Sequence, residues 1–502
     1  MKYQLISTAT LVVALSSFAM AGEWRSHFAD PANSGRAQVT GPDNPGLKWH
    51  MRLSDMVAGF APDGYRVAGN SSIDRPMVAP DGTLIMVAKN RNPQYESPSR
   101  LVREVIGINP DNGSVIWEIG NASTDHERCR PALDSQGRLW VHHAPDSDND
   151  TRLLAYDPAT GAPISGTAFV TTDITRCRRT ALHIGGEGEN ERLVMYGSGG
   201  DPEDLLVLDI SGPAPQISFQ LAGWTGLEAI SGVPVNSYQH RIGVFTDDSL
   251  IVGVRVTSGH RLLLRFPLDS DDPADIQQME MPTPEGLFSG DFWRMRMVTT
   301  DNGNLLISPT NANDPDAFVA KVNLEDDGMS TAWVTSLPNT SRGARDLTLL
   351  NNAVQVRVGG SGIQATVLST ETGEVLWDGV RAASRTIADP GEAVASGDLI
   401  FQNAFAPAGA SGSIYTSTRE PGHTRDRLMV SYDAKDGSRR WIIWPSTVME
   451  AAGVEELTDL GLGSFASLQF GAIGHDGTLY VTNTDSDLDG ILAIDNSGGL
   501  AE

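Results

Sequence analysis

The chain has only two cysteines among 502 residues and is short of positive charge, with 37 lysines and arginines against 63 acidic residues. Its net charge of −26 would repel a nucleic-acid backbone, so no nucleic-acid partner is expected. After the first 21 residues it also lacks the long apolar run that a membrane-spanning helix needs, so no such helix is expected. The simplest explanation of the excess of acidic residues is that they keep the protein soluble in a salty extracellular environment.

The N-terminus has the pattern of a secretory signal peptide over residues 1–21. Lys2 precedes a short apolar run that begins at Leu11, and Ala19-Met-Ala21 supplies the small residues of a cleavage site. Because no cysteine follows Ala21 directly, a lipid anchor is not expected. We therefore expect a periplasmic or secreted protein in which residues 22–46 form an irregular arm.

Glycine and proline are abundant, with 52 and 28 residues, and they surround a recurring motif. Its clearest copy is Ile108-Asn-Pro-Asp-Asn-Gly113-Ser-Val-Ile-Trp117, and related copies cover residues 154–161, 367–377 and 430–441. Each copy predicts a β-hairpin, in which an apolar strand enters a turn whose glycine adopts a positive φ. A hairpin repeated about every 50 residues predicts stacked sheets, because one hairpin alone leaves its faces uncovered.

The two ends of the repeat region complement each other. Residues 47–53 look like the tryptophan-bearing last strand of a unit, and the chain stops after Gly498 without such a strand. The expected fold is all-β: an eight-bladed β-propeller of four-stranded antiparallel blades over residues 47–498, closed by the N-terminal strand joining the last blade. Residues 499–502 are expected to be a tail. Two insertions are expected, a loop over residues 404–427 and a segment over residues 446–460 with a short helix.

The copies at residues 154–161 and 366–377 resemble the quinoprotein-like (PQQ-repeat) β-propeller family, whose blades end in a form of Ala-x-Asp-x-x-Thr-Gly-x-x-x-Trp. The family includes quinone-dependent alcohol dehydrogenases and non-catalytic scaffold proteins of the bacterial envelope. The dehydrogenases typically carry adjacent cysteines and a Glu/Asn/Asp calcium set beneath the quinone. The two cysteines here are far apart and the calcium set has no clear match, so the chain is nearer to the scaffold members, and PQQ is a doubtful cofactor.

Alignment of the first strands places an arginine at one position in six successive units. Arg296, for example, lies seven residues before Gly303 and nine before Leu305. The first strand of each blade lines the axis of a propeller, so these side chains are expected around one mouth of the central channel. The full set is Arg75, Arg130, Arg178, Arg241, Arg296 and Arg345.

A guanidinium group can donate two parallel hydrogen bonds to a carboxylate, sulfate or phosphate. The six arginines therefore predict a binding site for an anionic small ligand or a protein partner. The alternative is structural, with each arginine pairing with a carboxylate of a neighbouring blade. The candidate carboxylates are Asp74, Glu127, Asp173, Asp291 and Asp346.

One acidic loop has the spacing of calcium ligands. Asp485, Asp487 and Asp489 precede Gly490 and offer hard oxygen atoms around a tight turn. The alternative interpretation is an acidic hairpin tip that is simply solvated.

The two cysteines, Cys129 and Cys177, directly precede Arg130 and Arg178 and so hold equivalent positions in adjacent units. Export favours oxidation, and the pair predicts a cross-blade disulfide provided that the α-carbons lie within about 7 Å. Two free thiols are the alternative.

Catalytic residues are not identified, because the ten histidines are scattered and no nucleophile motif is present. The recurring Trp49, Trp117, Trp377 and Trp441 are interpreted as blade-to-blade packing. The expected function is that of an exported, non-enzymatic β-propeller that binds a protein partner or an anionic small ligand at the arginine-lined mouth. The alternative is a PQQ-dependent oxidoreductase that acts on alcohols or sugars with the help of calcium.

Overall fold

A computed structural model describes most of the β-structure of the chain. The described residues are 39–52, 72–73, 76–91, 101–119, 131–143, 151–171, 182–186, 188–196, 205–221, 235–237, 243–256, 260–270, 272–286, 289, 294–310, 318–337, 342–359, 364–378, 413–419, 427–433, 436, 438–453, 469–483 and 490–501.

The first four blades are antiparallel sheets that follow one another along the chain. Blade 1 comprises β2 (Ser72–Ile73), β3 (Met77–Val78), β4 (Leu84–Arg91), β5 (Leu101–Ile108) and β6 (Val115–Ile119). Blade 2 comprises β7 (Ala132–Leu133), β8 (Leu139–His143), β9 (Thr151–Tyr156) and β10 (Phe169–Thr171). Blade 3 comprises β11 (His183–Gly185), β12 (Arg192–Tyr196), β13 (Leu205–Asp209) and β14 (Gln216–Leu221). Blade 4 comprises β15 (Val235–Ser237), β16 (Val244–Phe245), β17 (Ser249–Val256), β18 (Arg261–Pro267) and β19 (Gln277–Glu280).

The remaining sheets follow the same order, except that the last one recruits the first strand of the chain. Blade 5 comprises β20 (Arg294–Thr299), β21 (Leu305–Thr310), β22 (Phe318–Glu325) and β23 (Gly328–Ser336). Blade 6 comprises β24 (Arg342–Leu349), β25 (Ala353–Gly359), β26 (Gln364–Ser369) and β27 (Val375–Asp378). A three-stranded sheet follows, with β28 (Ser413–Arg419), β29 (Arg427–Asp433) and β30 (Arg439–Ile443). Blade 7 comprises β31 (Gln469–Ile473), β32 (Leu479–Asn483), β33 (Gly490–Asp495) and β1 (Gly46–Met51).

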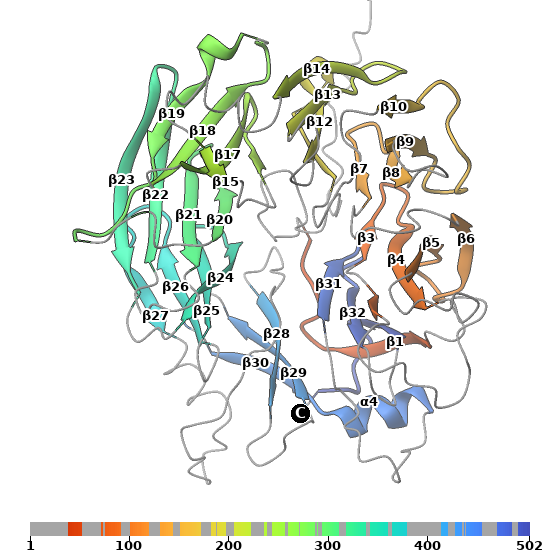
Figure 1. The fold of residues 1–502 in the computed structure, drawn as a ribbon. Coiled ribbons are helices and arrows are strands. Elements are labelled where there is room, and N and C mark those ends of the chain that lie inside the picture. Colours follow the sequence, from red (N-terminus) through yellow and green to blue (C-terminus); the bar gives the residue numbers. More distant parts are fainter. Residues whose placement is uncertain are drawn as a thin grey trace, which may run out of the picture.

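The sheets stand around a common centre, with their first strands inside and their last strands at the periphery (Figure 1). Apolar clusters join each sheet to the next one. The cluster around Trp140 and Leu193 joins blades 2 and 3, for example, and the cluster around Trp49 joins the three-stranded sheet, blade 7 and blade 1. The core is therefore a ring of interfaces between sheets, which is how a propeller buries surface in a long chain.

Ring closure follows the prediction, because β1 is the outer strand of the last blade. It pairs antiparallel with β33, from Gly46 opposite Asp495 to Met51 opposite Ile491. The preceding residues continue this contact, since the backbone carbonyls of Asn44 and Pro45 accept hydrogen bonds from Gly498 and Leu500. The predicted short helix is also present as α4 (Pro445–Ala452), which lies beside β1 (Figure 1).

The prediction of eight four-stranded blades is wrong. The structure has seven blades of four or more strands, and the described residues of the seventh predicted unit form the three-stranded sheet instead. The predicted loop over residues 404–427 is also wrong, because it contains β28, whose β-branched residues pair with β29. The count of eight relied on the opening strand–turn–strand segment expected in each unit. The segment expected near residue 397 lies outside the described residues, and the described strands β28, β29 and β30 form a sheet of three strands.

The tryptophans form a repeated lock between neighbouring sheets, as predicted. The indole nitrogen of Trp117 in blade 1 donates to the Pro158 carbonyl in the hairpin turn of blade 2, at 2.7 Å. Trp49 and Trp441 make the same kind of bond, to the Pro110 and Pro42 carbonyls. The turn glycine lies against the indole: Gly161 has a φ of 67°, and a Cβ there would be 2.7 Å from the Trp117 ring. Hence the recurring tryptophan of one blade packs against the recurring turn glycine of the next blade.

Blades 2, 3 and 4 lack this tryptophan on their last strands, and arginines take over the hydrogen bond. Arg138 of blade 2 donates to the Ile210 carbonyl in blade 3, and Arg192 of blade 3 donates to the Leu268 carbonyl in blade 4 at 3.1 Å. Arg265 of blade 4 donates to the Glu325 carbonyl in blade 5 at 2.6 Å. Two kinds of lock therefore occur around the described ring, with guanidinium donors on the successive blades 2, 3 and 4 and indole donors on blade 1, the three-stranded sheet and blade 7.

Candidate functional site

Two of the six predicted site arginines lie on described strands, and both are on the innermost strands of neighbouring blades. Arg296 lies on β20 of blade 5, and Arg345 lies on β24 of blade 6. These two strands contact each other across the blade junction. The other four, Arg75, Arg130, Arg178 and Arg241, lie outside the described residues.

The side chain of Arg296 is half-buried and belongs to the face of β20 that turns toward blade 6. Met295 and Met297 are buried in the cluster between blades 4 and 5, so strand alternation directs Arg296 to the opposite face. Val298 shares that face and belongs to the cluster that contains Leu347 and Leu349 of β24. The structure thus brings the backbone positions of Arg296 and Arg345 to the same junction.

The register of the inner strands agrees in several blades. The residue nine positions after the arginine pairs with the residue three positions after it in blades 1, 2 and 5. In blades 4 and 6 the partner is four positions after the arginine, and blade 6 has an irregularity between Ala344 and Asp346. In blade 3, where the hairpin is longer, Leu193 pairs instead with Ile184, six positions after Arg178. The register of the first hairpin is therefore the same in blades 1, 2 and 5, offset by one residue in blades 4 and 6, and different in blade 3.

The predicted calcium loop and the predicted disulfide cannot be placed, since Asp485, Asp487, Asp489, Cys129 and Cys177 lie outside the described residues. Within the described ranges, no group of three or more histidine, cysteine, aspartate or glutamate side chains could hold a metal ion. Among the same residues, no helix is long and apolar enough to cross a membrane.

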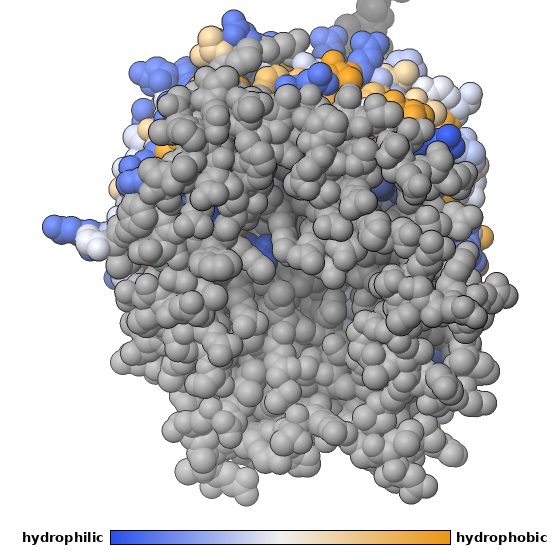
Figure 2. Space-filling view, in the orientation of Figure 1, coloured by the Kyte–Doolittle hydropathy of each residue, from blue (hydrophilic) through white to orange (hydrophobic). Residues whose placement is uncertain are grey.

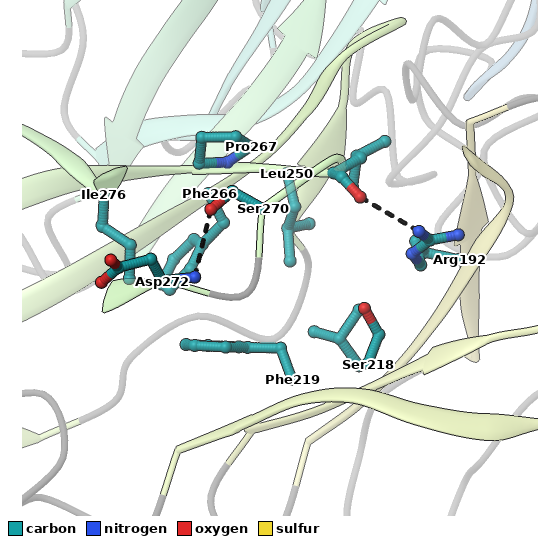
Figure 3. A pocket seen from close by; sticks show the side chains of 11 residues that line it. Arg192, Ser218, Phe219, Leu250, Phe266, Pro267, Ser270, Asp272 and Ile276 are labelled. Atoms are coloured by element: carbon teal, nitrogen blue, oxygen red, sulfur yellow. Dashed lines mark hydrogen bonds between the residues drawn. The ribbon is translucent and has the colours of Figure 1, made fainter. Parts of the chain in front are cut away.

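A cleft that sequence reasoning did not predict lies at the junction of blades 3 and 4 (Figure 3). Its volume is about 360 Å³, part of which is open to solvent. The walls are mainly apolar, and the rings of Phe219 and Phe266 lie 5.6 Å apart with an angle of 58° between them. Figure 3 shows Arg192 and Asp272 at opposite ends of the cleft. The lining residues are Arg192, Val207, Ser218, Phe219, Leu250, Phe266, Pro267, Leu268, Ser270, Asp272 and Ile276.

Arg192 is only 8% exposed, and backbone carbonyls hold it in place. Its terminal nitrogens donate to the carbonyls of Glu189, Glu191 and Leu268 at 3.0 to 3.2 Å. Asp209 lies 3.5 Å from the guanidinium and partly neutralises it. The Nε–H group is buried and has no hydrogen-bond partner among the described residues. A buried donor of this kind favours a nearby acceptor, because leaving it unpaired costs free energy.

The opposite end of the cleft is acidic and internally hydrogen-bonded. Asp272 accepts a hydrogen bond from the Ala274 amide at 2.8 Å, and the Ser270 hydroxyl donates to Asp275 at 2.6 Å. The cleft therefore has a cationic end, an apolar middle and an anionic end.

The sequence does carry a signal for this cleft, because blade 3 lacks the recurring tryptophan and the turn of blade 4 lacks the recurring glycine. Phe219 pairs with Val207 just before a β-bulge, as Trp117 pairs with Gly107 in blade 1, so Phe219 occupies the tryptophan position. The turn that should cover it, residues 268–276, is longer than the usual turn and contains no glycine. Finding the cleft from sequence required the strand register, which the motif did not give.

Apolar side chains are also present on the outer strands. Ile116, Val170, Ile217 and Leu376 lie on β6, β10, β14 and β27 and are each about half exposed. In Figure 2, hydrophobic and hydrophilic side chains are interspersed along the upper rim of the molecule. Single exposed aliphatic residues on a rim are ordinary and do not by themselves mark a docking site.

No protein-family model matches the chain, and no curated protein matches it. Solved β-propellers do match its structure. BamB from Moraxella catarrhalis has 13% sequence identity and a TM-score of 0.43, over 81% of this chain and 97% of that one. The quinohemoprotein alcohol dehydrogenase ADHIIG from Pseudomonas putida HK5 has 12% identity and a TM-score of 0.46, over 96% and 81%. Chaetomium thermophilum Sqt1, solved with the N-terminus of ribosomal protein L10, has 11% identity and a TM-score of 0.47, over 82% and 93%. At these identities the comparisons assign no family.

Proposed function

We propose that this chain is an exported, non-enzymatic β-propeller that binds a protein partner at the arginine-bearing side of its central channel. The observation that carries the proposal is the position of Arg296 and Arg345 on the neighbouring inner strands β20 and β24. Guanidinium groups that lie near one another repel each other unless anions lie nearby. Because guanidinium forks onto carboxylates, the partner surface would present aspartate or glutamate side chains.

The test compares charge reversals at the channel with one at the periphery. The double variant Arg296→Glu/Arg345→Glu is measured against wild type for binding of a fluorescent poly-glutamate peptide at low and moderate ionic strength. Arg152→Glu/Arg439→Glu, at two exposed positions on β9 and β30, makes the same change in net charge and serves as the control. We expect the channel variant to bind at least about tenfold more weakly than the control, a difference of roughly 1.4 kcal/mol.

Equal binding by the two variants would overturn the proposal, as would a channel variant that unfolds while wild-type binding is undetectable. The second outcome would support the structural interpretation, in which the arginines tie blades together. Competition by citrate distinguishes a small anionic ligand from a protein surface. Reduction of an artificial electron acceptor with alcohols, after addition of PQQ and Ca²⁺, would support the dehydrogenase alternative instead.

A further inference from the structure

Two hairpin turns of the propeller contain the same tripeptide, Asp-Asn-Gly. It covers residues 111–113 in blade 1, between β5 and β6, and residues 301–303 in blade 5, between β20 and β21. Asn112 and Asn302 are both exposed, and the glycines that follow them have φ values of 76° and 75°. The tripeptide, the exposure of the asparagine and the conformation of the glycine are therefore matched, and the two turns differ only in what the fold places around them.

An Asn-Gly pair can react with itself. The backbone nitrogen of the glycine loses its proton and attacks the side-chain Cγ of the asparagine. The new N–Cγ bond closes a cyclic imide, and the Cγ–Nδ2 bond breaks as the side-chain nitrogen leaves as ammonia. Water then opens the imide at one of its two carbonyls, which gives aspartate or isoaspartate. Glycine favours the attack because it has no Cβ to obstruct the approach, and the only co-reactant is water.

The fold holds the turn of blade 1 on several sides. The side-chain oxygen of Asn112 accepts hydrogen bonds from the amide and the hydroxyl of Ser114 at 2.9 and 2.7 Å. The attacking amide, that of Gly113, donates to the Asn109 carbonyl at 2.9 Å. Gly113 is also buried against Trp49, whose ring lies 2.7 Å from where a Cβ would be and whose indole donates to the same turn. The Gly113 nitrogen can reach the Asn112 side chain only if these contacts open together.

The turn of blade 5 is held much less. The side chain of Asn302 makes no hydrogen bond within the part of the chain that the structure describes. Gly303 is exposed, and no atom beyond its chain neighbours lies within 4 Å of where a Cβ would be. One hydrogen bond holds its amide, to the Thr300 carbonyl at 2.9 Å. A single exposed turn hydrogen bond opens far more often than a packed turn, so the reacting atoms meet more often here.

We propose that Asn302 is a site of spontaneous deamidation in the folded protein, whereas the fold protects Asn112. The product places a new carboxylate beside Asp301. Its isoaspartate form also adds a backbone carbon to a turn in which the Thr300 amide donates to the Asn304 carbonyl at 2.8 Å. Blade 5 would therefore gain negative charge and a longer turn as the protein ages. Because the reaction needs no ligand, this proposal is independent of the proposed partner site.

The test incubates the full chain at mildly alkaline pH, both folded and in denaturant. Peptide mapping by mass spectrometry, with chromatography that separates asparagine, aspartate and isoaspartate, gives the rate at each site. The ratio of the denatured to the folded rate measures protection by the fold, and we expect this ratio to be at least about tenfold larger for Asn112 than for Asn302. Equal ratios would overturn the proposal. Absence of conversion at Asn302 in the folded protein, over the time in which the denatured chain converts, would do the same.

Three variants test the assigned contacts. Ser114→Ala removes the hydroxyl that donates to Asn112, and Trp49→Phe removes the indole hydrogen bond to the turn. Each should speed deamidation at Asn112 and leave the rate at Asn302 unchanged, and an unchanged Asn112 rate in both would overturn the assignment of protection to these contacts. Asn302→Gln should abolish the signal from blade 5. The comparison of the two natural sites requires no substitution, so the proposal stays testable if the Trp49 variant does not fold.

Discussion

At the scale of single residues, the positive-φ glycines of the hairpin turns have two separate reasons to be glycine. One is backbone conformation, and the other is the approach of a neighbouring indole. Gly161 has both, with a φ of 67° and the Trp117 ring 2.7 Å from where a Cβ would lie. Gly166 has a φ of 84° but no atom within 4 Å of such a Cβ. The two positions therefore separate the conformational cost from the packing cost.

We predict that Gly161→Ala lowers the free energy of unfolding by about 3 kcal/mol, of which roughly 1 to 2 kcal/mol is the left-handed backbone and the rest is overpacking. Gly166→Ala should cost only the backbone part, about 1 to 2 kcal/mol. Trp117 cannot easily move away, because its indole donates to the Pro158 carbonyl at 2.7 Å. Urea unfolding of both variants measures the difference, and equal losses would show that the indole contact carries no cost.

At the scale of elements, the arginine locks differ from the tryptophan locks because they bury charge. Arg138 donates to the Gly212 and Ile210 carbonyls of the next blade, and its other side pairs with Asp134, which is 1% exposed. Asp134 also accepts from the Gln136 and Arg138 amides and from the Trp140 indole. The pair is thus fully hydrogen-bonded within one hairpin and reaches across one junction.

Arg138→Met should destabilise the protein by about 3 to 5 kcal/mol, because it leaves the Asp134 carboxylate buried without its cation. The double variant Asp134→Asn/Arg138→Met removes the orphaned charge and should recover a substantial part of that loss. A double-mutant cycle, measured by chemical unfolding, gives the coupling. If the destabilisations of Asp134→Asn and Arg138→Met add up to that of the double variant, the two charged groups do not stabilise each other.

The same elements show what a sequence can and cannot predict. The hairpins, the tryptophan packing and the closing strand were predicted correctly, because each depends on a local motif such as Asn109 to Gly113 or on strand-like residues at the two ends. The blade count was wrong, since an opening strand near residue 397 was counted for the sheet that carries Trp441, and this sheet has three strands among the described residues. The arginine locks and the cleft were missed, because they depend on the register that aligns Phe219 with Trp117 and on contacts between residues such as Arg192 and Leu268, which are 76 positions apart.

At the scale of the whole molecule, strand β1 and its side chains close the ring by joining the last blade. Lys48 on β1 contacts Asp476 in the β31–β32 turn at 2.9 Å and Asp111 of blade 1 at 3.7 Å. Arg440 reaches Asp43, and the Trp441 indole donates to the Pro42 carbonyl. The segment before β1 is thus tied to the three-stranded sheet while β1 itself is tied to blades 7 and 1. Strand β1 and the residues just before it therefore contact three sheets: blade 7, blade 1 and the three-stranded sheet.

This closure makes stability depend on pH through Asp476. Burial alone would raise the pKa of Asp476, but hydrogen bonds from Lys48 and Thr478 outweigh burial and lower its pKa below the usual value. A lowered pKa in the folded state means that the ionised carboxylate contributes stability above the unfolded-state pKa, near 4, and loses it as the pH falls through the folded-state value. Because the side chain of Asp476 is half exposed, the contribution is about 1 kcal/mol at most.

We predict that Asp476→Asn is less stable than wild type at pH 7 and that the two unfolding curves converge as the pH falls below about 4. Asp81→Asn is the matched control, because Asp81 accepts the same two hydrogen bonds from Thr83 that Asp476 accepts from Thr478, without a lysine contact among the described ion pairs. Urea unfolding from pH 7 to pH 3 should show a gap that closes for Asp476→Asn, and the same measurement on Asp81→Asn gives the cost at pH 7 of losing such threonine hydrogen bonds alone. A gap of constant size for Asp476→Asn would mean that the ionised carboxylate does not stabilise the closed ring, and that the backbone ladder of β1 with β33 holds it alone.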